Sequence, residues 1–359
     1  MLSKVTSRIL IVNPYGIGDV LFSTPLIRTL REKYPKATMA VLLGSRTEDI
    51  LEFNPNIDAI FTYNKDHYRG LPFLQKIRYL SKLLFTIRKK NFDVCFDLSN
   101  NDEYGFLAKF IWGIPVRIGF NYKNRGRFLT HKIKLKNGFS KKHVVEHYNA
   151  LLKFLKIDIA KIRKKLDFYV DPSQKEWLQK LWAHYHIKEN DKVICILPGG
   201  GASWGEQASY RYWPPSHFGK LADNLIEKQG AKIFLIGSSS EKKLCKEVIE
   251  HMKYSAIDLS GQTTLHQLGT LMAHCSLVIG SESGPLHLAT ALNCTTLPIY
   301  GPVDENVYGP HTENESQTSL YHSVPCRPCY KNFSMPQCQN KICLEELELH
   351  SILHQATNS

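Results

Sequence analysis

Short apolar runs alternate with helix-patterned segments along most of the chain. Runs such as Ile-Leu-Ile-Val at 9–12 are apolar at every position, which is typical of strands buried on both faces of a parallel sheet. The alternation occurs twice, and a polar stretch without strand signals, about 162–191, separates the two halves. We predict strands at 9–13, 38–43, 59–63, 92–98 and 116–120, and then at 193–197, 232–236, 256–259, 277–279 and 296–300.

Helical periodicity fills the gaps between these strands. Residues 74–89 place Leu80, Leu83, Leu84 and Ile87 on one helical face. Further helices are expected to begin near residues 214, 240, 265 and 285. Alternating strands and helices predict an α/β protein with parallel sheets, whose ligands bind at the carboxyl ends of the strands in a cleft between two domains. The expected parts are an N-terminal Rossmann-like domain at 1–165, a linker at 166–190, a second Rossmann-like domain at 191–345 and a C-terminal helix or tail at 346–359.

The charge of the chain is unevenly distributed. It totals +13, from 46 Lys and Arg against 33 Asp and Glu, and no acidic residue occurs between Tyr104 and Val145. This field suits a phosphorylated lipid, an anionic membrane surface or a nucleic acid, although a basic face that only keeps the protein soluble has the same composition. No recognised nucleic-acid-binding motif accompanies the charge, so we expect no nucleic-acid partner. The cations of this segment are Lys109, Arg117, Lys123, Arg125, Arg127, Lys132, Lys134, Lys136, Lys141 and Lys142.

The apolar content also bears on location. No apolar run approaches the length of about 20 residues that crosses a bilayer. The N-terminal apolar run leads directly into a Gly-containing loop, so we interpret it as a first strand rather than as a signal peptide. We therefore expect a cytoplasmic protein.

The nine cysteines form two groups. The spacing of four of them, CxxC followed after eight and four residues by two more, suits a small tetrahedral zinc or iron site in a loop before the last helix. A reduced structural cluster without metal is the alternative, and disulfides are disfavoured in the cytoplasm. These four are Cys326, Cys329, Cys338 and Cys343. The other five lie singly in apolar patterns and are interpreted as small buried hydrophobes: Cys95, Cys195, Cys245, Cys275 and Cys294.

Candidate chemistry begins after the first strand, in the Gly-containing loop 13–19, which ends in Asp19. Asp19 is either the N-cap of the next helix or a general base that accepts a proton from a hydroxyl. That helix begins either at Val20 with a kink near Pro25, or at Pro25. Gly16 and Gly18 permit a tight turn and also fit a dinucleotide fingerprint. However, the third glycine is missing, which leaves a nicotinamide dehydrogenase weakly supported.

The second half repeats a strand, loop and helix design that suits an anion. At 281–287, Ser-Glu-Ser-Gly-Pro-Leu-His places a helix N-terminus, capped by Ser283, directly after a buried strand. Gly199 and Gly200 allow backbone N–H groups to face a phosphate, and Arg211 can add a charged contact. Glu241 either accepts hydrogen bonds from ribose or favours its helix N-terminus. Each loop alone also fits an ordinary turn, but their combination is more specific than any member.

Seven motifs follow one another along the chain: GDVLFSTPLIRTL (18–30), FDVCFDL (92–98), PGG with RYWP (198–214), IGSSSE (236–241), LSGQTTL (259–265), GSESGPLHLATAL (280–292) and GPVD (301–304). Together they resemble glycosyltransferase family 9, the ADP-heptose:lipopolysaccharide heptosyltransferases. The resemblance implies a GT-B arrangement of two Rossmann-like domains, with the nucleotide sugar on the C-terminal domain and the acceptor on the N-terminal one.

The resemblance also implies roles for individual residues. Asp19 would be the catalytic base, and Arg211 would stand where relatives usually have lysine. Glu282 occupies a position that is usually Asp. The implied donor-binding residues are Gly18, Gly199, Gly200, Glu241 at the ribose, Thr263 near the adenine, and Glu282, Ser283, Gly284 and His287 at the diphosphate. Lys123, Arg125 and Arg127 are candidates for binding an acidic acceptor.

The function implied in this way is the inverting transfer of a heptose from ADP-heptose to an acidic lipopolysaccharide inner-core acceptor on lipid A. No cofactor would be required for catalysis, and the protein would be cytoplasmic or peripheral at the inner face of the inner membrane, in contact with anionic lipid. Some relatives glycosylate autotransporter proteins and carry an iron-binding cysteine motif, so a protein heptosyltransferase is one alternative. Another is a non-catalytic protein that binds a nucleotide sugar or a metal without turnover.

Overall fold

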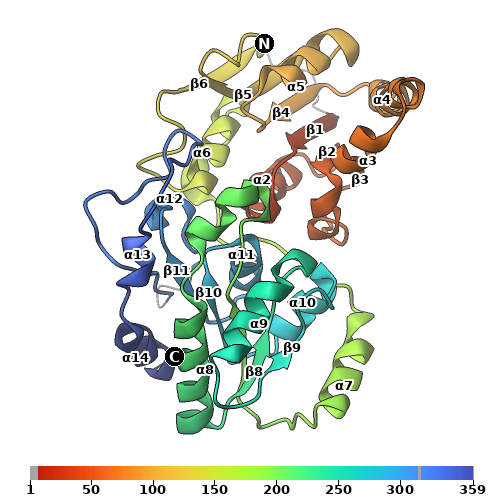
Figure 1. Ribbon diagram of the computed structural model, residues 1–359. Helices are drawn as coiled ribbons and strands as arrows, with labels where there is room; N and C mark the ends of the chain where they lie inside the picture. The colour runs from red at the N-terminus through yellow and green to blue at the C-terminus, as the bar shows by residue number, and fades with distance from the viewer. Residues whose placement is uncertain (1–6, 314–316, 359) are drawn as a thin grey trace. The chain divides into compact units, whose positions relative to one another are not determined.

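The computed structural model describes residues 7–313 and 317–358, and the chain divides into two compact units, 1–169 and 170–359 (Figure 1). Residues 1–6 of the predicted N-terminal domain and Ser359 of the predicted C-terminal tail lie outside the described residues. Each unit is built on a six-stranded parallel sheet covered by helices. No described helix combines the length and the apolarity needed to span a membrane.

Unit 1 has the strand order β3-β2-β1-β4-β5-β6. Buried apolar side chains fill both faces of β1, and α2 and α6 contact each other on one side, while α4 and residues 104–112 pack on the other. The strands are β1 (Arg8–Asn13), β2 (Thr38–Gly44), β3 (Ala59–Tyr63), β4 (Val94–Asp97), β5 (Val116–Tyr122) and β6 (His131–Leu135). The helices are α1 (Ile17–Phe22), α2 (Thr24–Lys33), α3 (Lys65–Gly70), α4 (Phe73–Arg88), α5 (Asp102–Phe106) and α6 (Val144–Ala150).

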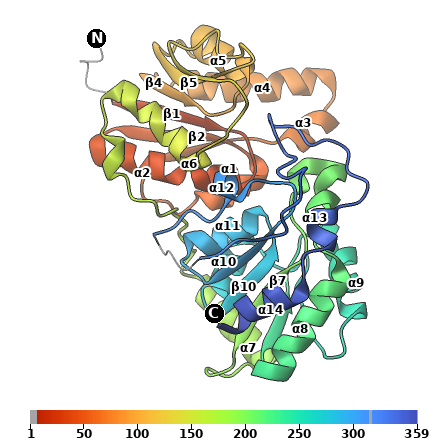
Figure 2. The same ribbon diagram turned by 90° about the vertical axis from the view of Figure 1, so that its left-hand side faces the viewer.

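Unit 2 repeats this order as β12-β11-β10-β7-β8-β9. One core joins the sheet to α8, α9, α13 and α14, and α7 contacts α10, which contacts α11 (Figure 2). The strands are β7 (Val193–Leu197), β8 (Lys232–Leu235), β9 (Ile257–Asp258), β10 (Leu277–Ser281), β11 (Thr296–Tyr300) and β12 (Leu320–Tyr321). The helices are α7 (Gln174–His184), α8 (Pro215–Gln229), α9 (Lys242–Glu250), α10 (Leu265–Met272), α11 (Gly284–Ala291), α12 (Glu305–Tyr308), α13 (Ile342–Glu345) and α14 (Leu349–Asn358).

The predicted α/β class is confirmed, and two edge strands are additions to it. All ten predicted strands are present, with bounds that differ by up to two residues. The prediction omits β6 and β12. The sequence of β6, His-Lys-Ile-Lys-Leu, alternates as in an exposed edge strand and lacks a continuous apolar run, and β12 is only two residues long. Within the predicted linker 166–190, α7 packs against α10, so it is part of unit 2.

Both sheets reverse direction at their central pair of strands. In unit 1 the chain proceeds outward from β1 to β3 and then returns to place β4 on the other side of β1. In unit 2 the same reversal lies between β7 and β10. Loops that follow such a central pair diverge to opposite faces, and the crevice between them is where open α/β sheets bind ligands. The structure therefore points to two loop pairs, one in each unit.

Candidate functional site

In unit 2, glycines allow the loops after β7 and β10 to approach each other closely. Gly200 has φ +144°, and a Cβ atom at this position would lie 2.4 Å from the Cβ of Ser283. A Cβ on Gly199 would lie 2.3 Å from Oε1 of Glu241. Because a side chain at either position would displace its neighbour, the two glycines let three predicted donor-site segments converge. The structure thus brings together Gly199, Gly200, Glu241 and Ser283.

Ser283 occupies the N-cap position of α11, but its side chain does not cap the helix. The predicted capping by this hydroxyl is therefore wrong, although Ser283 has the extended backbone that is usual at an N-cap. Its side chain is buried, with 1% of its surface exposed, and its Oγ has no hydrogen-bond partner within the described part of the chain. A buried, unpartnered hydroxyl beside the first N–H groups of an eight-residue helix, which begins at Gly284, is suited to bind an anion.

Arg211 and Glu282 form a buried ion pair behind this position. The second carboxylate oxygen of Glu282 lies 3.4 Å from Nε2 of His287. Burial and the nearby Arg211 lower the pKa of His287 to about 3, so this imidazole is neutral at physiological pH and its contact with Glu282 is a hydrogen bond rather than an ion pair. Both oxygens of Glu282 therefore face protein groups, a pairing that the sequence alone did not predict.

An aromatic stack also holds Arg211. Its guanidinium carbon lies 4.6 Å from the ring centroid of Trp204, and that ring lies 4.6 Å from the ring of Tyr330. The backbone N–H groups of Cys329 and Tyr330 both donate to the carbonyl of Pro302. The loop that contains the cysteines therefore holds Tyr330 against Trp204, on which Arg211 stacks. No motif in the sequence indicated this contact, because Trp204 and Tyr330 are distant in the chain and neither lies in a regular pattern.

Glu241 and Thr263 lie at helix starts on the same sheet edge. The Oε2 atom of Glu241 accepts hydrogen bonds from the backbone N–H and the hydroxyl of Ser238, at 2.7 and 2.8 Å. This is a capping box, so Glu241 does stabilise its helix N-terminus. Thr263 lies directly before Thr264, the N-cap of α10. The predicted contacts of Glu241 with ribose and of Thr263 with adenine stay predictions.

In unit 1, α1 and α2 resolve the alternative helix starts that the sequence left open. Both helices form, with Gly16 as the N-cap of α1 and Ser23 as the N-cap of α2. Asp19 is half-buried in the first turn of α1, so its interpretation as an N-cap is wrong. Gly18 also lies inside α1 rather than in a tight turn. The side-chain amide of Asn13 donates to the carbonyl of Asp19 at 2.9 Å, which ties α1 to the end of β1.

Asp97 faces the same crevice of unit 1 from the end of β4. Its carboxylate accepts hydrogen bonds from the backbone N–H and the hydroxyl of Ser99, at 3.0 and 2.5 Å. Burial nevertheless raises the pKa of Asp97 to about 6. The Oδ1 atoms of Asn13 and Asn100 are buried here without a partner in the described residues. Sequence reasoning did not single out Asp97, although its place in the FDVCFDL strand was a signal.

The predicted acceptor cations lie in the connection from β5 to β6. Lys123, Arg125 and Arg127 are exposed, and Arg127 pairs with Asp102. Other cations of the acid-free segment serve the fold instead. Arg117 donates to the carbonyls of Phe128 and Ile114, and Lys132 donates to the carbonyl of Gly126. The three exposed cations therefore remain candidates for binding an acidic ligand.

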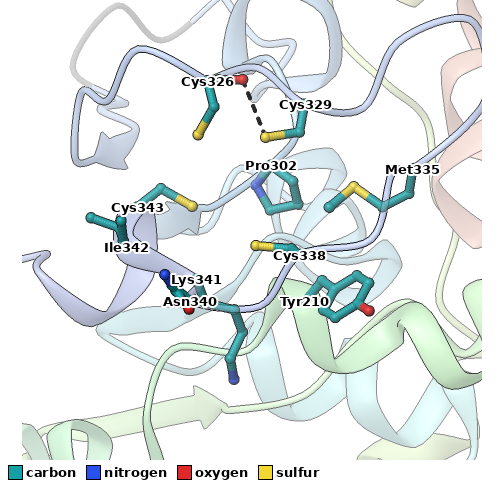
Figure 3. A pocket seen from close by; sticks show the side chains of 10 residues that line it. All are labelled: Tyr210, Pro302, Cys326, Cys329, Met335, Cys338, Asn340, Lys341, Ile342 and Cys343. Atoms are coloured by element: carbon teal, nitrogen blue, oxygen red, sulfur yellow. Dashed lines mark hydrogen bonds between the residues drawn. The ribbon is translucent and has the colours of Figure 1, made fainter.

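The four clustered cysteines line one small cavity of about 70 Å³ (Figure 3). Cys326, Cys329, Cys338 and Cys343 turn their sulfur atoms toward the same space, and all four are reduced. As they stand, no three His, Cys, Asp or Glu side chains of the described residues are placed to hold a metal ion. Among the other cysteines, four are buried as predicted and Cys275 is half-buried, and the sulfur atoms of Cys195 and Cys275 lie 3.3 Å apart.

The raised pKa of Asp97 predicts a pH-dependent stability of unit 1. A carboxyl whose pKa is higher in the folded state stabilises the fold at low pH, and this contribution is lost as the pH rises from about 4 to about 6. Asp97→Asn keeps an acceptor for Ser99 without a charge. We expect this variant to exceed the wild type by about 1 kcal/mol at pH 4.5 and by about 3 kcal/mol at pH 7.5 in urea unfolding.

A matched control for this measurement is Asp66→Asn, an exposed aspartate of the same unit, which should change the free energy of unfolding little at either pH. Equal stabilities of wild type and Asp97→Asn at both pH values would show that Asp97 is ionised in the folded protein without cost.

Comparisons with known proteins agree with this architecture. The E. coli K12 lipopolysaccharide heptosyltransferase 3 is 26% identical over 326 residues, 86% of this chain and 88% of that protein. The structure of E. coli ADP-heptose lps heptosyltransferase II superposes with a TM-score of 0.74 at 22% identity, over 98% of each chain. E. coli heptosyltransferase WaaC with ADP-2-deoxy-2-fluoro heptose gives a TM-score of 0.70 at 17% identity, over 98% of this chain and 99% of that one.

These structural likenesses confirm the predicted GT-B fold class. The family model described as glycosyltransferase family 9 (heptosyltransferase) matches residues 80–340, which is most of the chain. Four of the motifs that suggested this family, GDVLFSTPLIRTL, FDVCFDL, PGG and GSESGPLHLATAL, lie at the two crevices, and the RYWP arginine contacts the GSESGP loop. The chain therefore belongs to glycosyltransferase family 9 and is a glycosyltransferase.

Proposed function

We propose that the chain transfers a heptose from ADP-heptose to an acidic lipopolysaccharide inner-core acceptor, with the donor on unit 2 and the acceptor on unit 1. The observation that carries the donor part is the buried, unpartnered hydroxyl of Ser283 at the N-terminus of α11, beside Gly200. A diphosphate is the part of a nucleotide sugar that such a site binds. Relatives named as lipopolysaccharide heptosyltransferases support the sugar and the acceptor class.

On the donor side, negative charge develops on the departing diphosphate as the anomeric carbon loses it. The N–H groups that begin α11, the Ser283 hydroxyl and the Arg211 guanidinium meet this charge from fixed positions. Glu282 and Trp204 hold Arg211 in place before the donor arrives, so little reorganisation accompanies the reaction. Neutral His287 supports Glu282 without adding a second buried cation.

On the acceptor side, Asp19 accepts the proton of the acceptor hydroxyl. The hydroxyl oxygen then attacks the anomeric carbon from the face opposite the diphosphate, so a single displacement inverts the configuration. The proton ends on Asp19 and the bonding electrons leave with ADP. These steps conserve atoms and charge, and no cofactor takes part in them.

The proposed binding partners of the protein depend on the chemistry of the acceptor. The inner core carries negative charge, which Lys123, Arg125 and Arg127 can meet from the exposed loop after β5. Because lipid A anchors the acceptor in a bilayer, the enzyme works in the cytoplasm in peripheral contact with anionic lipid at the inner face of the inner membrane. A protein acceptor is the alternative within the same reaction.

Replacement of the base tests the proposed reaction. With ADP-heptose and truncated lipopolysaccharide, mass analysis should show one added heptose for the wild type, and Asp19→Asn should lower kcat by about 10²-fold or more. Asp66→Asn, an exposed aspartate of unit 1, is the control and should keep full activity. Near-normal transfer by a folded Asp19→Asn variant would exclude the base, and addition only to an autotransporter protein would favour the alternative acceptor.

The ion pair of Arg211 provides a test of the donor site that needs no turnover. Glu282→Gln leaves the Arg211 charge buried without its partner, which should lower the Tm. ADP should then raise the Tm of this variant by about 4 °C more than that of the wild type, since its phosphates supply the missing negative charge.

The matched control is Glu282→Asp, which keeps the charge and should respond to ADP as the wild type does. If ADP shifted the Tm of Glu282→Gln and of the wild type equally, Arg211 would not face the phosphates.

We also propose that the four-cysteine cluster binds a structural zinc or iron. Four thiols line one cavity, and thiolates are the ligands that both metals prefer, although the thiols must draw together to hold an ion. Metal analysis of purified protein should find about one equivalent, retained in Cys245→Ser and lost in Cys326→Ser/Cys343→Ser. Metal-free wild-type protein whose four thiols react freely with a thiol reagent would contradict this proposal.

A further inference from the structure

Helix α4 has an apolar face that the fold of unit 1 does not use. Its inner side packs Leu83, Leu84 and Ile87 against the core of the sheet. However, Phe73 and Leu74 are 75% and 77% exposed, and Ile77 and Phe85 are more than half exposed. Large apolar side chains with this exposure, gathered on one helix, mark an interaction surface.

Cations border this apolar face. No acidic residue occurs between Leu71 and Phe92, and at 100° per residue Arg78, Lys82 and Lys89 fall next to the apolar row. The Nζ atom of Lys89 lies 4.4 Å from the ring centroid of Phe85. An apolar stripe flanked by cations alone is the pattern of helices that lie in the interface of a membrane. The segment holds six such cations, Lys76, Arg78, Lys82, Arg88, Lys89 and Lys90.

A neighbouring segment extends the surface. Phe106, at the end of α5, and Phe110 are 43% and 52% exposed, and Nζ of Lys109 lies 4.6 Å from the ring centroid of Phe110. This segment joins the same core cluster as α4, and the Arg88 guanidinium donates to the carbonyl of Ile111 (Figure 2). We define the α4–α5 face by Phe73, Leu74, Ile77, Phe85, Phe106 and Phe110.

The first turns of α4 extend past the end of the sheet. The hydroxyl of Tyr79, near the middle of the helix, accepts a hydrogen bond from the backbone N–H of Asn64 at 3.0 Å, and Asn64 directly follows β3. Residues before Tyr79 therefore lie beyond the carboxyl ends of the strands. Asp19 and Asp97 lie at this same edge of unit 1. A surface bound to the α4–α5 face would thus lie near the edge that carries the proposed base.

We propose that the α4–α5 face docks unit 1 on a membrane surface of anionic phospholipid. Phe73, Leu74 and Ile77 enter the headgroup region, and the flanking cations meet lipid phosphates. Charge selects lipid over a second copy of the chain, because a copy that docked through α4 would place the cations of the acid-free segment 71–92 against each other. The inference deepens the proposed function, on which it rests for an acceptor that is anchored in a membrane. The docking itself is argued only from the exposed residues of the α4–α5 face.

Flotation of the full chain with vesicles that lack any acceptor tests the docking. Vesicles of phosphatidylcholine with about 30 mol% phosphatidylglycerol should bind the wild type, and binding should fall steeply with added salt and on pure phosphatidylcholine. Phe73→Ser/Leu74→Ser should lower the partition coefficient by about tenfold or more. Lys82→Glu/Lys89→Glu should also lower it by about tenfold or more, since each cation near the surface contributes about fivefold. Tyr254→Ser, an exposed aromatic of unit 2, is the matched control and should bind as the wild type does.

The readouts separate the possible failures. Each variant should keep the wild-type Tm and its transfer rate to a delipidated, soluble acceptor, because the substituted side chains are exposed and none belongs to the proposed catalytic or donor-binding residues. Vesicle binding that is unchanged in Phe73→Ser/Leu74→Ser, or a loss of self-association in that variant without vesicles, would overturn the docking. Loss of transfer by wild-type protein that still binds vesicles would instead refute the proposed function.

Discussion

The reversal of chain direction at the centre of each parallel sheet is the constraint on which the candidate sites depend. Parallel strands need crossover connections that cover the faces of the sheet, and only at the reversal do two neighbouring strands send their chains to opposite faces. In unit 2 this frees the ends of β7 and β10, where Gly200 packs against Ser283. In unit 1 it frees the ends of β1 and β4, where Asp19 and Asp97 lie.

Within unit 2, the buried pair of Arg211 and Glu282 organises the site. Two charges out of water are costly unless each is paired and hydrogen-bonded, and here Glu282 is shared between Arg211 and neutral His287. Arg211 stacks on Trp204, and Trp204 packs against Tyr330, so these contacts connect the ion pair to the cysteine-containing loop. Glu282 thus holds Arg211 and contacts His287, and its predicted contact with the donor stays a prediction.

The sequence predicted the features that local pattern determines. The central strand β7 is predicted at its observed bounds because both its faces are buried and every position is apolar. Edge strand β6 was missed because one side of it faces solvent. The Arg211 to Glu282 pair and the raised pKa of Asp97 depend on side chains that meet only after folding, so no motif could show them. The cysteine spacing predicted a zinc or iron site. The four thiols do line one cavity, but no three metal-binding side chains of the described residues are placed to hold an ion, because their separation depends on the folded loop rather than on the spacing.

The same topological constraint links chemistry to location in unit 1. A crossover helix that follows a parallel strand begins at the carboxyl edge of the sheet, so α4 and α5 start on the edge where β1 and β4 present their loops. Any residue added to the beginning of such a helix projects beyond that edge rather than over the face of the sheet. Apolar residues at Phe73 and Leu74 therefore extend the unit on its ligand-binding side. A fold of this kind can gain an exposed apolar surface next to the crevice of unit 1 without changing a single strand, because the helix start is free to vary while the core positions Leu83, Leu84 and Ile87 hold the helix in place.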